Sequence, residues 1–151
     1  MTGAPADRVR ELVEVVAEAF GLDARVEVQE VGDEIHATLH GENLGLLIGR
    51  HGATIDAVQH LAYKVASKEG PARVVVDAAG YRARRRQVLE RQADQAAEEA
   101  LRTDRAVALE AMSATERKVV HEHLKDRSGL QTYSEGTEPN RHLVVAPLRR
   151  G

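Results

Sequence analysis

The sequence contains no cysteine and no tryptophan, and it has only four aromatic side chains among 151 residues. A chain without cysteine has no disulfide bonds, thiolate metal ligands or cysteine nucleophiles, which fits a reducing compartment. The scarcity of aromatic rings disfavours modules that bind bases by stacking them on exposed aromatic platforms. The four rings belong to Phe20, Tyr63, Tyr81 and Tyr133.

Long hydrophobic runs are also missing. No stretch approaches the roughly 18 consecutive apolar residues that a membrane helix needs. Acidic residues stand near the N-terminus, where a signal peptide has its apolar stretch. We therefore expect a cytoplasmic protein without membrane insertion, folded as one ordinary domain or two small ones around a buried core.

Net charge is small, at −3 near pH 7, but it is unevenly distributed. Residues 1–48 carry three basic and ten acidic side chains, whereas residues 49–91 carry nine basic and four acidic ones. The remaining residues are nearly balanced. A weakly acidic protein of this kind can still bind a polyanion through a local basic patch, with a strong dependence on salt.

Apolar spacing in the first half alternates between the periods of helices and strands. Apolar residues three and four apart predict helices over residues 7–20 and from about residue 53 to the stop at Gly70-Pro71. Alternation on either side of Gly32-Asp33 predicts a hairpin of two strands. The valine-rich segment 73–77 predicts a third strand.

The second half has its own set of elements. A segment rich in alanine, arginine and glutamate predicts a long helix over residues 81–101. Ser113 and Glu116 have the spacing of a capping box, which predicts a helix from there to about Lys125. Strands are predicted over residues 105–109, 131–134 and 142–145. No internal repeat and no low-complexity linker separates the two halves.

A glycine-rich turn is the most informative local feature of the sequence. Gly49 and Gly52 let another backbone approach closely, and they precede a helix whose first amides are unpaired and carry partial positive charge. Arg50 and His51, between them, add donors suited to phosphate oxygens. Taken alone, the same pattern also fits a plain turn between two helices.

The surroundings of this turn favour a more specific interpretation. A Gly-x-x-Gly turn, preceded by a helix and a hairpin and followed by a helix and a strand, resembles the type II K homology domain of RNA-binding proteins over residues 7–78. The resemblance implies that the turn clamps the backbone of about four single-stranded nucleotides while an adjoining apolar groove admits their bases. The residues that match the clamp and its apolar flanks are Gly49, Arg50, His51, Gly52, Ile48 and Ile55.

A second pattern lies in the last predicted helix. Arg117 and His121 are four residues apart, so they share one helical face, which is either a phosphate contact or a half-solvated surface. Together with LQTYSEG and EPNRHLVVAP, the segment resembles the Arg-x-x-x-His domain, a nucleic-acid-binding module, over residues 81–148. The resemblance implies that Arg117 and His121 bind nucleic acid or organise the site, and that the matching downstream segment contains Ser134, Glu135, Gly136 and the nucleic-acid-binding Arg141.

The order of the two modules resembles the Jag family of SpoIIIJ-associated bacterial proteins, also called KhpB. This implies an α+β protein of two small α/β-sandwich modules, the first α-β-β-α-α-β and the second α-β-α-β-β. It also implies an RNA-binding regulator linked to cell growth and division. Implied partners are single-stranded RNA, with single-stranded DNA left open, and a homodimer or a heterodimer with a small protein that has only a K homology domain. Many members carry a further N-terminal domain, whereas the first helix predicted here starts at about residue 7.

Arginines are concentrated at the start of the long predicted helix. Arg82, Arg84, Arg85 and Arg86 could add sequence-independent contacts to phosphates, or they could form an ordinary solvated helix face. Both interpretations stay open at the level of the sequence.

Catalytic and metal motifs are not recognisable. His121 and His123 point in nearly opposite directions on a helix, and His36 and His40 lie about 13 Å apart along a strand, so neither pair can hold one ion. We expect no catalytic residue, no cofactor and no metal site. Two alternatives to RNA regulation remain: a protein-interaction adaptor or dimerisation module with incidental RNA binding, and a nucleic-acid enzyme. For the adaptor, Glu11, Glu14 and Glu18 would form an acidic outer face of the first helix.

Overall fold

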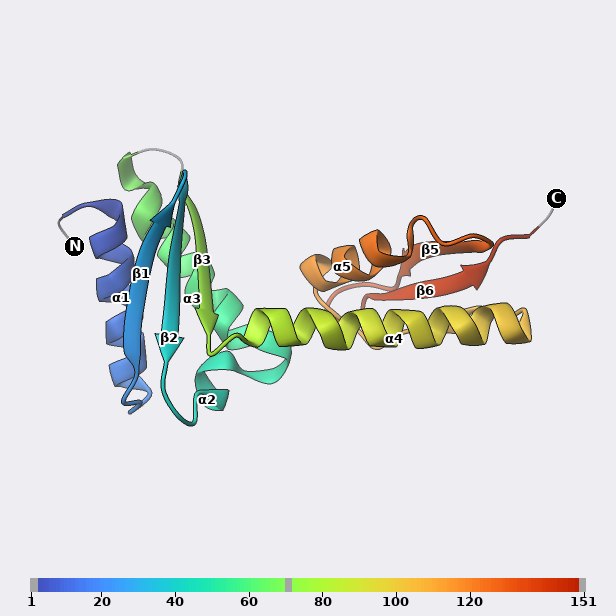
Figure 1. The fold of residues 1–151 in the computed structure, drawn as a ribbon, viewed down its shortest axis with the longest axis horizontal. Coiled ribbons are helices and arrows are strands. Elements are labelled where there is room, and N and C mark those ends of the chain that lie inside the picture. The colour runs from blue at the N-terminus through green and yellow to red at the C-terminus, as the bar shows by residue number, and fades with distance from the viewer. Residues whose placement is uncertain (1–2, 70–71, 150–151) are drawn as a thin grey trace. The chain divides into compact units, whose positions relative to one another are not determined.

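A computed structural model describes residues 3–69 and 72–149, and the chain divides into two compact units, residues 1–83 and 84–151 (Figure 1). The first unit contains α1 (Pro5–Ala19), β1 (Arg25–Val31), β2 (Glu34–His40), α2 (Gly45–Ile48), the 3-10 turn η1 (Arg50–Gly52), α3 (Ala53–Ala66), the 3-10 turn η2 (Ser67–Glu69) and β3 (Arg73–Ala78). Helix α4 (Tyr81–Thr103) begins at the end of this unit. The second unit adds β4 (Val107–Ala108), α5 (Ala114–Leu124), β5 (Leu130–Glu135) and β6 (His142–Pro147).

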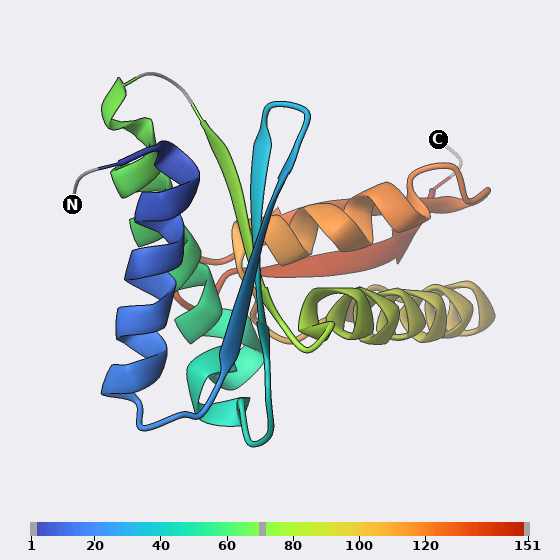
Figure 2. The same ribbon diagram turned by 60° about the vertical axis from the view of Figure 1, so that its left-hand side comes forward.

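The first unit is a three-stranded sheet with α1 and α3 packed on one face (Figure 2). Strands β1 and β2 form an antiparallel hairpin, in which Val26 lies opposite Leu39. Strand β3 runs parallel to β2, with Val74 opposite Ile35. Parallel neighbours need a crossover connection, and here the crossover consists of α2, η1 and α3. It therefore brings the glycine turn to the end of the sheet at which β2 finishes.

Alternation along the strands and helical spacing along α1 and α3 supply the core of this unit. Fully buried members include Val9 and Val13 from α1, Leu39 from β2, Ile55 and Ala62 from α3, and Val76 from β3.

One charged side chain is part of this core. Arg8 is only 2% exposed, although it lies on the first turns of α1. Its Nε donates to the carbonyl of Val65 at 2.8 Å and its Nη2 to the carbonyl of Ala66 at 3.3 Å, while Nη1 donates to the carbonyl of Gly3. The last carbonyls of a helix have no partner within the helix, so Arg8 donates to carbonyls at the C-terminal end of α3 that would otherwise lack a partner.

The second unit is a separate three-stranded antiparallel sheet in the order β4-β6-β5. Leu143 and Val145 point from β6 into a core shared with α4 and α5. Helix α4 contributes mostly alanine to this core, and such small side chains allow close packing on the sheet. Its buried residues are Leu89, Ala93, Ala96, Ala97 and Ala100.

The predicted α+β class and the order of the elements in both halves are confirmed. Some boundaries were wrong. The strand predicted over residues 105–109 is only Val107–Ala108, followed by one irregular hydrogen bond from Leu109 N to the carbonyl of Leu143 at 2.9 Å. The long helix runs on to Thr103 rather than ending at Leu101. The stop predicted at Gly70-Pro71 lies outside the described residues.

The predicted cap at Ser113 is present. Its Oγ accepts from the amide of Glu116 at 3.2 Å. In a full capping box the Glu116 carboxylate would also accept from the amide of Ser113. Here that carboxylate accepts instead from Arg85 Nε at 2.7 Å and from Arg85 Nη2 at 3.3 Å. This largely buried ion pair joins α4 to α5 within the second unit.

Candidate nucleic-acid interface

The glycine turn between α2 and α3 is built from three residues in the left-handed region of φ. The φ angles are +76° at Gly49, +54° at His51 and +79° at Gly52. A Cβ atom on Gly49 would lie 2.8 Å from the backbone nitrogen of Thr54, and one on Gly52 would lie 2.8 Å from the Tyr81 ring. Both contacts are shorter than real Cβ atoms make. The fold therefore requires glycine at both ends of the turn.

The two residues inside the turn face solvent. Arg50 and His51 are exposed, and neither forms an ion pair or a side-chain hydrogen bond with any residue that the structure describes. The turn is held instead by its own backbone, since Gly49 N donates to the carbonyl of Gly45 at 2.9 Å and Gly52 N to that of Gly49 at 3.2 Å. Side-chain donors are thus available on a rigid support.

Helix α3 begins directly after the turn, and none of the described side chains caps its N-terminus. The first amides of a helix lack intrahelical acceptors and carry partial positive charge. The amides of Gly52 and Ala53 donate to the carbonyls of Gly49 and Arg50. The positive end of the α3 dipole, together with Arg50, therefore forms a surface suited to an anion.

The apolar residues predicted to flank the turn lie at different depths. Ile48 is half-buried, whereas Ile55 is 0% exposed and packs in the core, so Ile55 supports the turn from below. Exposed apolar surface comes from Leu46, which is 68% exposed, and from Ala53 and Ala57 on the outer face of α3.

The outer residues of α3 were not among the residues predicted from the sequence. On a helix, the positions opposite the buried Ile55, Val58 and Ala62 belong to one outward stripe that starts at the turn. The stripe consists of Ala53, Ala57, His60 and Lys64, all exposed. Helical spacing alone was a sufficient signal for it.

Replacing Gly52 with alanine should destabilise the first unit by about 1–3 kcal/mol, because the positive φ and the approach of Tyr81 both oppose a Cβ. Urea unfolding followed by far-UV circular dichroism measures the loss. Gly45→Ala is the matched control, because Gly45 lies in α2 with nothing within 4 Å of an added Cβ. The free energy of unfolding of this variant should stay the same or rise. Equal losses in the two variants would contradict the requirement for glycine at position 52.

In the second unit, Arg117 and His121 lie on the same side of α5 but have different surroundings. Arg117 is 9% exposed, and its Nη1 donates to the carbonyl of Met112 at 2.6 Å while Nη2 pairs with Glu138 Oε1 at 2.9 Å. His121 is exposed, and its Nδ1 shares a hydrogen bond with Thr132 Oγ1 on β5. Arg117 therefore holds the segments around Met112 and Glu138, and His121 is the accessible member of the pair.

The downstream segment predicted from the sequence spans the end of β5 and the turn that leads to β6. Ser134 and Glu135 are the last residues of β5, Gly136 begins the turn, and all three are exposed. Arg141 is half-buried, and its Nη1 donates to the carbonyl of Gly136 at 2.6 Å. This bond closes the turn beside the Arg117–Glu138 pair.

The four arginines at the start of α4 differ in exposure, and two of them have structural roles. Arg82 donates to the carbonyl of Val76 at 2.8 Å, to Asp56 Oδ1 at 2.8 Å and to Gln59 Oε1 at 3.0 Å, so it ties the beginning of α4 to the first unit. Arg85 is held by Glu116. Arg84 and Arg86 are exposed.

Two carboxylates and one lysine have shifted pKa values. The hydrogen bond from His36 lowers the pKa of Glu34, with help from Arg73. A hydrogen bond between Lys125 and Glu122, at 2.8 Å, lowers the pKa of Glu122 and raises that of Lys125. Because every shift favours the charged form, all three groups are ionised at neutral pH.

The histidines are dispersed. His121 contacts Thr132, whereas His123 pairs with Asp94 at 2.9 Å. On the sheet of the first unit, His36 pairs with Glu34 and His40 with Glu27. Within the described ranges no three His, Asp or Glu side chains gather as a metal ion would require.

Within the same ranges no helix is both long and apolar enough to cross a membrane.

Comparison with known proteins gives two domain matches and several similarities that span most of this chain and part of each relative. Residues 7–78 match the KhpA/KhpB KH domain, and residues 87–147 match the Arg-x-x-x-His domain. The chain is 36% identical over 147 residues to RNA-binding protein KhpB of Clostridium symbiosum, covering 95% of this chain and 66% of that protein. It is 33% identical over 150 residues to RNA-binding protein KhpB of Bacillus subtilis, covering 96% of this chain and 72% of that protein. A KhpB protein of Lactiplantibacillus plantarum is 40% identical over 135 residues, covering 87% of this chain but 41% of the relative.

Proposed function

The chain belongs to the KhpB family, and from this premise we propose that it binds single-stranded RNA through the turn at residues 49–52. The observation that carries the proposal is the pairing of two obligatory glycines with two exposed donors, Arg50 and His51. Thr54 and Tyr81 fill the space beside the two glycines, so the surface left open at the turn is that of Arg50 and His51. A ribose-phosphate strand laid across this turn meets the positive end of the α3 dipole and the guanidinium of Arg50.

The surface next to the turn is where we place the contacts with the RNA bases. Leu46, Ala53 and Ala57 offer exposed aliphatic surface, and His60 and Lys64 continue the stripe with polar atoms. Unstacked bases can pack on such a surface without aromatic platforms, which agrees with the few rings in the sequence.

We assign the second contact with RNA to the exposed His121 and to Arg141, with Arg117 positioning the segments around them. This division is supported by the burial of Arg117 and by its bonds to Met112 and Glu138. Two contacts on one chain raise the effective concentration of each for the same strand. The proposed domains span residues 7–78 and 81–148, and the proposed location is the cytoplasm. The link to cell growth and division stays a prediction.

Salt dependence tests the proposal. If about four phosphates are neutralised, a plot of log affinity against log salt should have a slope near −3 for single-stranded RNA. The measurement is fluorescence anisotropy of a labelled twelve-nucleotide oligouridine with the full chain at several salt concentrations. A slope near zero, or no binding at all, would overturn the proposed function. Competition with DNA of the same sequence decides between the two nucleic acids.

A second candidate function is a protein-interaction adaptor, in which a second copy or a small K homology protein binds the first unit. It is favoured by the outer face of α1, where Glu11, Glu14 and Glu18 are exposed beside exposed Val15. Size-exclusion chromatography with light scattering, before and after nuclease treatment, separates the two functions. An assembly that survives nuclease and contains no RNA would support the adaptor.

A further inference from the structure

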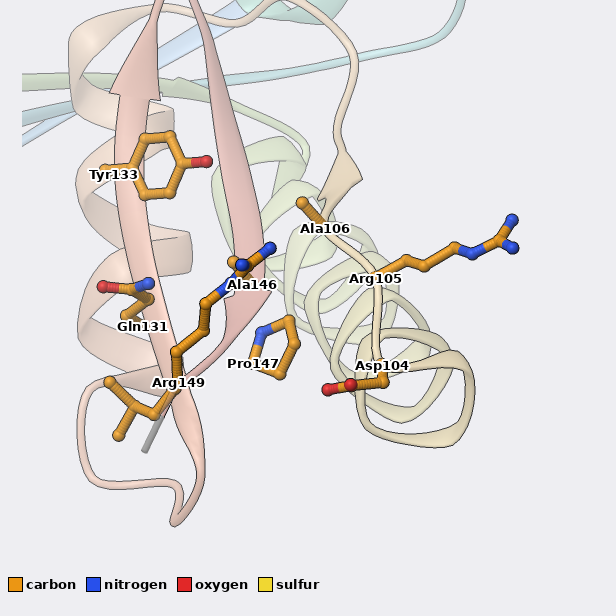
Figure 3. Close-up of a pocket in the computed structure, with 9 residues that line it drawn as sticks. Asp104, Arg105, Ala106, Gln131, Tyr133, Ala146, Pro147 and Arg149 are labelled. Carbon is orange, nitrogen blue, oxygen red and sulfur yellow. The ribbon is translucent and has the colours of Figure 1, made fainter. Parts of the chain in front are cut away.

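A hollow of about 800 Å³ lies on one face of the second sheet (Figure 3). Its lining comes from the α4–β4 connection, β5 and the end of β6, and includes Asp104, Arg105, Gln131, Tyr133, Ala146 and Arg149. In the strand register Gln131 lies opposite Ala146 and Tyr133 opposite Val144. Successive side chains alternate between faces, so these residues lie on the face opposite the core residues Leu143 and Val145.

The hollow is separate from the residues on α5. Thr132, which bonds His121, has its side chain on the core side of β5, since it lies opposite Val145. Gln131 and Tyr133, its neighbours along the strand, point the other way. A ligand in the hollow would therefore contact different atoms from a ligand at His121.

Tyr133 provides an exposed ring in this hollow. It is the one aromatic residue in residues 84–151, and it is 44% exposed on β5, an edge strand of the sheet. Figure 3 shows the ring projecting from β5 on the same side as Gln131. An aromatic ring on a sheet face can stack one base, and the nearby Gln131 amide has both a donor and acceptors for a base edge.

The charge of the hollow favours an anion. Arg105 and Arg149 bring two positive charges against the single negative charge of Asp104. Neither arginine forms an ion pair with any residue in the described part of the chain. In Figure 3 Arg149 extends back over the sheet, whereas Arg105 points outward from the rim. Arg149 can thus reach a phosphate inside the hollow, and Arg105 a phosphate outside it.

We infer that this hollow binds one nucleotide of a single-stranded RNA, with the base stacked on Tyr133 and a phosphate held by Arg149. The inference rests on the proposed RNA binding and adds a second, independent recognition surface to it. It also qualifies the expectation drawn from composition: the chain has too few rings for a row of stacked bases, but one ring is enough for a single base.

Photocrosslinking and affinity measurements on the full chain test this inference. The probe is a twelve-nucleotide RNA in which every base is 4-thiouridine, so that some thiobase occupies the hollow in any register. After irradiation, mass spectrometry of the peptides should find a crosslink at Tyr133. Tyr133→Phe keeps a ring and should bind within about twofold of the original chain, whereas Tyr133→Ser should bind about tenfold more weakly. Arg149→Ala should reduce the magnitude of the logarithmic salt slope by about 0.7.

The outcomes distinguish a failure of binding in the hollow from a failure of RNA binding as a whole. Equal affinities of the original chain and Tyr133→Ser, with no crosslink at position 133, would overturn this inference and leave binding at the glycine turn intact. Absence of RNA binding by the original chain would overturn the proposed function, and this inference with it. Thermal melts of the variants, expected to coincide, show that any loss of affinity does not come from unfolding, because Tyr133 is not part of the core.

Discussion

Replacing both Arg50 and His51 with aspartate is expected to weaken RNA binding by about a hundredfold or more while the melting temperature stays the same. A hydrogen bond involving a charged group contributes about 1.5–3 kcal/mol, so losing two such donors removes about two to four orders of magnitude. The new carboxylates add repulsion toward phosphate. Stability should not change, because both side chains are exposed and aspartate tolerates the left-handed φ of position 51.

The measurement is anisotropy of the labelled oligouridine at fixed salt, together with a thermal melt. A matched control reverses charge at the other end of the first unit, in Lys68→Asp/Arg73→Asp. Both control residues are exposed, and Lys68 lies beyond the far end of α3, which spans roughly 20 Å. The control changes the net charge at least as much, so it should weaken binding only slightly. Similar losses in the two variants would mean that overall charge, and not the turn, governs binding.

Replacing Arg8 with methionine is expected to cost about 2–4 kcal/mol of stability in the first unit. The carbonyls of Val65 and Ala66 would lose their donors inside the core, and an unsatisfied buried polar group costs about 1–3 kcal/mol. Removing a buried charge returns part of this, because the guanidinium no longer has to be desolvated. For a unit of this size the melting temperature should fall by about 10–20 °C.

Urea denaturation of the full chain, followed by circular dichroism, measures this loss. Arg10→Met is the matched control, since Arg10 lies two residues away on α1, is less buried, and donates one hydrogen bond to the carbonyl of Val26 at 3.0 Å. We expect the control to lose about 1 kcal/mol or less. A smaller loss for Arg8→Met than for Arg10→Met would show that Arg8 does not support the end of α3.

The elements of this fold could be predicted because their signals are local. Apolar spacing determined α1 and α3, the Gly32-Asp33 turn determined the β1–β2 hairpin, and the Ser113 cap determined the start of α5. The strand around Val107 was overestimated for the opposite reason. Its length depends on how much of β6 is free to pair with it, and no local pattern in the sequence contains that information.

The depth of individual charged residues could not be predicted either. Arg8 is buried because it meets carbonyls that lie 57 and 58 positions further along the chain. Arg117 is buried because the segment around Glu138 folds back over it. In both cases a helical wheel shows only an arginine next to an apolar face. The two donors of the turn were easier to identify from the sequence, since glycines at both ends leave Arg50 and His51 as the only side chains between positions 49 and 52.

The glycine turn has a consequence for how such a chain can diversify. Thr54 and Tyr81 require glycine at positions 49 and 52. The side chains of Arg50 and His51, between these glycines, have no hydrogen-bonding or ionic partner among the described residues. Position 50 can accept almost any residue, and position 51 any residue that tolerates a left-handed backbone, such as asparagine, aspartate or glycine. Ligand preference at these two sites can therefore drift or be engineered without compromising foldability.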